Sequence, residues 1–138
     1  MSFKRINSLC TTNNERSFVI VYNFNTKDTL MIKNILKLLG IKDVCTLNKD
    51  NANSKIEDII KGNIDDTCSQ GINQMAVIFN NIAHTKISGF SDNLRKFKIN
   101  RPLMAVVTED NISWSLNTLI NNLINERNAI NSGNTLNH

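Results

Sequence analysis

Two similar segments follow one another along this chain, and this internal repeat restricts the fold more than any other feature. The run FVIVYN at residues 18–23 resembles MAVIFN at residues 75–80, which begins 57 residues later. The run VCTLNKDN at residues 44–51 resembles MAVVTEDN at residues 104–111, an offset of 60 residues. A segment with helical spacing of apolar residues follows each run. The repeat therefore predicts two consecutive βαβα halves, at residues 17–62 and 75–131.

The length and composition suit a single domain of this kind. The chain has 138 residues, of which 41% are hydrophobic, and this is enough to bury one core. We expect a flexible N-terminal arm at residues 1–16, one α/β domain at residues 17–131 and a disordered tail at residues 132–138.

Strands that alternate with helices favour right-handed crossovers and a parallel sheet. A pseudo-twofold relation between the halves places the first and third strands side by side at the centre. We therefore predict a four-stranded, mainly parallel sheet of order 2-1-3-4, with helices on both faces. The alternative is a ferredoxin-like α+β fold, which requires the second and third strands to be antiparallel.

Familiar catalytic and cofactor motifs are absent from the sequence. It contains neither the G-x-x-x-x-G-K-[ST] phosphate loop nor the G-x-G-x-x-G dinucleotide motif. Its two histidines, His84 and His138, form no Ser-His-Asp or Cys-His set. We therefore predict no catalytic residues, no metal site and no cofactor, and a protein that is not an enzyme.

The cysteines and the hydropathy indicate where the protein resides. Cys10, Cys45 and Cys68 are odd in number and form no C-x-x-C pair, which fits a reducing compartment. No segment approaches the roughly 20 apolar residues that span a bilayer. We predict a cytoplasmic protein that does not enter a membrane.

Ligands of open parallel sheets bind beyond the carboxyl ends of the strands, where the strand order reverses. Amide and carboxylate side chains at this point can hold a small polar ligand by hydrogen bonds, but they supply no nucleophile. The candidate ligand-binding residues are Asn23, Asn25, Asn80, Asn81, Thr108, Glu109, Asn111 and Trp114.

The segment TEDNISW at residues 108–114 has two interpretations. In the structural one, Asn111 or Ser113 caps the last helix and Trp114 packs near the end of the sheet. In the functional one, Trp114 stacks on a ligand and Glu109 accepts a hydrogen bond from it.

The positive charge of the chain, +4 in total, is concentrated near residue 100. Arg95, Lys96, Lys98 and Arg101 lie within seven residues that contain no acid. A solvated helix end is one interpretation of this cluster. The other is contact with a phosphate or a nucleic acid, although the wide basic surface and aromatic platforms that such binding uses are missing.

Residues 75–130 resemble a known family through several short motifs. These are MAVIFN at residues 75–80, RPLMAVVTE at residues 101–109, Asn111 and Trp114, and a final Leu123, Glu126 and Arg127. Together they are similar to the bacterial domain-of-unknown-function family numbered 3783. The resemblance implies neither catalytic residues nor a cofactor, because that family has no established activity. The first helix of this region is acidic in the family, whereas this chain carries Lys86, Arg95 and Lys96 there.

These observations favour a non-enzymatic binding or protein-interaction module of bacterial origin with a regulatory role. Its partner would be another protein or a second copy of the chain, in a homodimer. The first alternative is a domain that binds a small polar ligand, or a minor enzyme, at the carboxyl ends of the strands. The second is weak nucleic-acid binding through residues 95–101.

Overall fold

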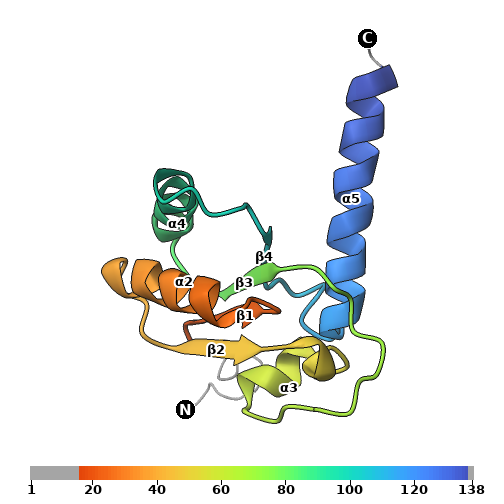
Figure 1. Cartoon of the computed structure of the whole chain (residues 1–138). Coiled ribbons are helices and arrows are strands. Elements are labelled where there is room, and N and C mark those ends of the chain that lie inside the picture. The colour runs from red at the N-terminus through yellow and green to blue at the C-terminus, as the bar shows by residue number, and fades with distance from the viewer. Residues whose placement is uncertain (1–15, 137–138) are drawn as a thin grey trace, which may run out of the picture.

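The computed structural model describes residues 16–136, and within them residues 131–136 as backbone only. Most of the predicted N-terminal arm therefore lies outside the described residues. Four strands form one sheet (Figure 1): β1 (Phe18–Tyr22), β2 (Val44–Leu47), β3 (Ala76–Asn80) and β4 (Leu103–Val106). The helices are α2 (Thr26–Leu38), the short 3-10 helix η1 (Lys49–Asn51), α3 (Ile56–Ile60), α4 (His84–Lys96) and α5 (Leu116–Leu136).

The strand order is β2-β1-β3-β4, which confirms the predicted order. β1 pairs with β2 and β3 with β4 in parallel, whereas the central pair β1–β3 is antiparallel. The expectation that β1 and β3 run in the same direction is therefore wrong. A twofold axis along the strands would make this pair parallel, and an axis perpendicular to the sheet makes it antiparallel. β2 and β3 also run in opposite directions, as the ferredoxin-like alternative required, but β1 separates them.

Helices cover both faces of the sheet, as predicted. α2 and α4 pack on the face that presents Val19, Val21, Val77 and Phe79. α3 and α5 pack on the other face, together with the loop of residues 63–74. Both crossover helices, α2 and α4, lie on the same face because reversing the second half also reverses the side to which a right-handed crossover leads.

The antiparallel centre changes how the two halves correspond. Ile20 pairs with Ile78 at the middle of the β1–β3 ladder, so equivalent positions are 58 residues apart. An offset of 57 would exchange the two faces, since neighbouring strand residues point to opposite sides. Backbones with positive φ follow the offset of 58: Asn23 and Asn81 have φ of 64° and 56°, and Gly40 and Lys98 have φ of 81° and 57°.

The second part of each half follows the offset of 60. Here the segments that lead into α3 and α5 exchange backbone hydrogen bonds in matched pairs. The N–H of Ile56 donates to the Trp114 carbonyl at 3.0 Å, and the N–H of Leu116 donates to the Ser54 carbonyl at 3.0 Å. Glu57 to Ile112 and Asn117 to Ala52 form the second pair. These bonds satisfy helix N–H groups that would otherwise need side-chain caps.

α5 differs from the predicted last helix at both of its ends. It begins at Leu116, so neither Asn111 nor Ser113 caps it, and the Ser115 hydroxyl accepts from the Thr118 N–H instead. It continues to Leu136, so residues 132–136 are helical rather than a disordered tail, because a long helix propagates readily through Asn and Ser once it is nucleated. None of the helices within residues 16–136 combines the length and the apolar character needed to cross a bilayer.

Candidate functional site

The antiparallel centre separates the candidate ligand-binding residues. Asn23 and Asn25 follow β1 at one end of the sheet. The Asn23 Nδ2 donates to Asn73 Oδ1 at 3.0 Å, and the Asn25 Oδ1 accepts from the Asp28 N–H at 2.7 Å as the cap of α2. Asn80 and Asn81 follow β3, which points the other way. No single cleft therefore gathers all four amides.

At the opposite end, Asn80 and Asn81 hold the chain that enters β1. Their Nδ2 atoms donate to the Arg16 carbonyl at 2.6 Å and 3.3 Å. The Arg16 guanidinium in turn donates to Asp43 at 2.8 Å and 3.0 Å, and to the carbonyls of Ile59 and Ile60. The two amides thus anchor Arg16, which ties β1, β2 and the end of α3 together.

The Arg16–Asp43 pair should make stability depend on acidity. The hydrogen bond from Arg16 holds the pKa of Asp43 below its ordinary value. The pair therefore stabilises the fold above the unfolded pKa of about 4, and its contribution disappears as the pH falls through the lower folded pKa. In urea unfolding, Asp43→Asn should be less stable than wild type at neutral pH, and the gap should close in strong acid. A gap independent of pH, or an equal one in the control Asp66→Asn, would contradict this.

The turn after β4 brings together three of the candidate residues, Thr108, Asn111 and Trp114. The Asn111 side chain is buried, accepts from the Thr108 N–H at 2.8 Å and donates to the Val106 carbonyl at 3.1 Å. Trp114 is half-buried and packs against the core that lies under α5. Glu109 is exposed at the tip of this turn.

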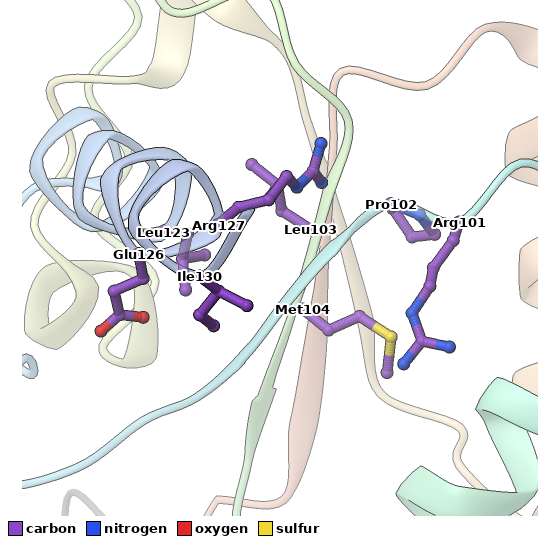
Figure 2. Close-up of a pocket in the computed structure, with 8 residues that line it drawn as sticks. All are labelled: Arg101, Pro102, Leu103, Met104, Leu123, Glu126, Arg127 and Ile130. Carbon is purple, nitrogen blue, oxygen red and sulfur yellow. The ribbon is translucent and has the colours of Figure 1, made fainter. Parts of the chain in front are cut away.

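A long trough runs along the outer side of β4, beneath α5. Two adjoining hollows of about 600 and 400 Å³ share Met104, Leu123 and Glu126, and together they form this β4–α5 trough. Its other lining residues are Arg101, Pro102, Leu103, Ala105, Val106, Thr108, Asp110, Asn111, Trp114, Leu119, Asn122, Arg127 and Ile130. Figure 2 shows Arg127 and Ile130 extending from α5 towards the segment that carries Leu103 and Met104.

One wall of the trough is the free edge of the sheet. The N–H groups of Leu103 and Val107 donate to the Met75 and Phe79 carbonyls of the β3 segment, both at 2.9 Å. Because backbone groups alternate along a strand, those of Met104 and Val106 point away from β3. Asn111 occupies the Val106 carbonyl. The N–H groups of Met104 and Val106 and the carbonyl of Met104 remain on the open edge.

The other wall is a helix that extends beyond the sheet. Leu116, Leu119 and Ile120 of α5 are buried against the strands. Residues 125–130 are exposed, and Ile130 is 62% exposed. Figure 1 shows α5 continuing well past β4. This overhang covers the space in which a fifth strand would lie.

A comparison with protein-family models identifies part of the chain. Residues 75–130 match the domain of unknown function DUF3783. This confirms the resemblance over the segment from β3 into α5. Neither the curated proteins nor the solved structures yielded a match to the chain. Within the DUF3783 segment, most residues that carry the resemblance after β3 line the trough, among them Arg101, Trp114, Glu126 and Arg127.

Analysis of polar side chains alone missed most of the trough. Its apolar lining and the open backbone of β4 carry no motif, and only the resemblance motifs pointed to Arg101 and Arg127. The basic cluster also divides: Arg101 lines the trough, whereas Arg95 pairs with Asp92 and Lys96 lies over the Phe97 ring. Among residues 16–136, no three His, Cys, Asp or Glu side chains gather closely enough to hold a metal ion.

Proposed function

We propose that this protein is a protein-interaction module that binds an extended segment of a partner along β4, beneath α5. The observation that carries this proposal is the combination of an open strand edge with a helix that overhangs it. Addition of a strand to an exposed edge is a recurring way to bind peptides, in which main-chain hydrogen bonds give affinity and side-chain pockets give specificity.

The backbone of β4 offers both kinds of hydrogen-bonding group. The N–H groups of Met104 and Val106 can donate to an added strand, and the Met104 carbonyl can accept from it. Val106 is 46% exposed beside them. A long apolar edge strand left bare would promote aggregation, so occupation by a partner also explains why it tolerates an exposed valine.

The side chains around this edge define the sequence that would fit. Alternate residues of an added strand would point towards α5 and meet the apolar side chains of Leu119, Leu123 and Trp114. At the start of β4 the trough carries Arg101 and Arg127, with Glu126 beside them. The expected ligand therefore has apolar residues at alternate positions and an acidic residue at the end near the two arginines.

Binding suits this trough better than catalysis. Its lining residues, all within the described part of the chain, include no His, Cys, Ser, Lys or Tyr. The Thr108 hydroxyl accepts from the Asn111 N–H within the turn. A regulatory role in the bacterial cytoplasm fits a small module that recognises a partner and has no reaction of its own.

Peptide selection followed by amide exchange tests this proposal. Peptides of about ten residues would be selected from a random display library and added to the isotope-labelled protein. The Met104 and Val106 amides should exchange quickly in the free protein and slowly with a selected peptide, whereas Leu103 and Val107 should be protected in both. Protection at Met104 and Val106 that grows with protein concentration alone would identify a second copy as the strand donor. Selected peptides that protect neither amide would overturn the proposal.

A further inference from the structure

The α2–α4 layer carries most of the positive charge of the chain. Residues 26–42 and 84–101, which form α2, α4 and the turns after them, contain nine Lys and Arg but only two Asp. Residues 43–80 and 102–130, which include α3 and most of α5, contain four Lys and Arg against nine Asp and Glu. The moderate net charge of +4 therefore conceals two faces of opposite sign.

An apolar hollow lies within this positive face. It has a volume of about 210 Å³ and is lined by Met31, Asn34, Ile35, Leu38 and Phe97. Leu38 is 75% exposed and Phe97 is 45% exposed. Leu30, one helical turn before Asn34, is also exposed and extends the apolar stripe along α2. Large apolar side chains that gather at an exposed hollow mark an interaction surface.

Cations flank this hollow on two sides. Lys33 and Lys37 of α2 are exposed and line the neighbouring hollow beside β2. On the α4 side, the Lys96 Nζ lies 5.8 Å from the centroid of the Phe97 ring. The surface is therefore apolar along its centre and positive along both margins.

We propose that this α2–α4 face binds an acidic amphipathic helix of a partner protein. One large apolar side chain of the partner enters the hollow beside Leu38 and Phe97, and its carboxylates pair with Lys37 and Lys96. A nucleic acid would place phosphates over the apolar centre, where they find no partner. A bilayer surface would not enter a concave hollow. The α2–α4 face is separate from the β4–α5 trough, so the two surfaces can be tested independently.

The probe is a synthetic peptide of about 16 residues with Leu at helical spacing on one side and Glu elsewhere. Its binding to the full chain would be measured by isothermal titration calorimetry at about 50 mM and about 200 mM salt. We expect saturable binding that weakens with salt. A scrambled peptide, in which the leucines no longer share a side, should bind at least about tenfold more weakly.

Matched variants locate the binding surface. Leu38→Ser and Lys37→Glu should each weaken the acidic peptide at least about fivefold. Ile64→Ser and Lys61→Glu make the same changes at exposed positions of the α3 side and should have no effect. Val106→Pro, which alters only the open edge of β4, should also bind the peptide normally. Circular dichroism would verify that each variant is folded.

Three results would overturn the inference. Equal affinity for the scrambled peptide would show that charge alone attracts the probe. Unchanged affinity in Leu38→Ser and Lys37→Glu would place the binding elsewhere. Tighter binding of a single-stranded oligonucleotide, or of vesicles rich in phosphatidylserine, that is lost in these same variants would assign the face to a nucleic acid or a membrane instead.

Discussion

Replacing Val106 by proline should weaken the binding of a strand-forming peptide by at least about tenfold and leave the fold intact. Proline lacks the N–H that Val106 presents on the open edge, and its ring would block the close approach of an added strand. The bonds from β4 to β3 come from the alternate residues, so they are kept. Calorimetric titration of selected peptides into wild type and variant measures the effect, and the thermal midpoint reports on the fold.

Two further variants make this result interpretable. Val106→Thr keeps the N–H and the β-branched shape, so it should bind the peptide nearly as well as wild type. Leu103→Pro removes an N–H that donates to the Met75 carbonyl, so it should destabilise the sheet itself. Full affinity in Val106→Pro would mean that peptides bind through the side chains of the trough, without adding a strand to β4.

The strand order could be predicted from the sequence, but the direction of the central pair could not. Apolar runs at residues 18–22 and 76–80 identify central strands because both of their faces are buried. The same runs fit either direction, since a twofold axis along the strands or perpendicular to the sheet puts β1 beside β3. Only the faces on which Val19 and Val77 lie separate an offset of 57 from one of 58. That choice depends on contacts with α2 and α4, which sit far away in the sequence.

The candidate site was only partly accessible from the sequence for a related reason. A search for polar side chains found Thr108, Asn111 and Trp114, which line part of the trough, because polar turns after strands are a recognisable pattern. It could not find the open backbone of β4, because every residue has an N–H and a carbonyl. It could not find the overhang of α5 either, since this depends on where the helix crosses the sheet. Trp114 fits both of its interpretations, as it packs on the core and lines the trough.

The position of that overhang depends on the loop before β3, and Gly71 is the residue that lets this loop lie close. The Asn117 side chain of α5 accepts from the Ile72 N–H at 3.0 Å and donates to the Gln70 carbonyl at 3.3 Å. The Tyr22 hydroxyl donates to the Ile72 carbonyl at 2.9 Å. A Cβ at Gly71 would lie only 2.2 Å from the Lys49 carbonyl oxygen. The loop can therefore hold the start of α5 only if residue 71 is glycine.

Gly71→Ala should accordingly lower the free energy of unfolding by about 3 kcal/mol, because the clash is with backbone that cannot rotate away. Urea unfolding followed by circular dichroism measures the loss. In the matched control Gly89→Ala, the new Cβ would meet only the flexible Leu39 side chain at 3.0 Å. The helix propensity gained there, about 1 kcal/mol, should offset that contact. Equal stability of the two variants would show that residues 70–72 do not lie against Lys49, and the start of α5 would then lack the anchor that sets its overhang above β4.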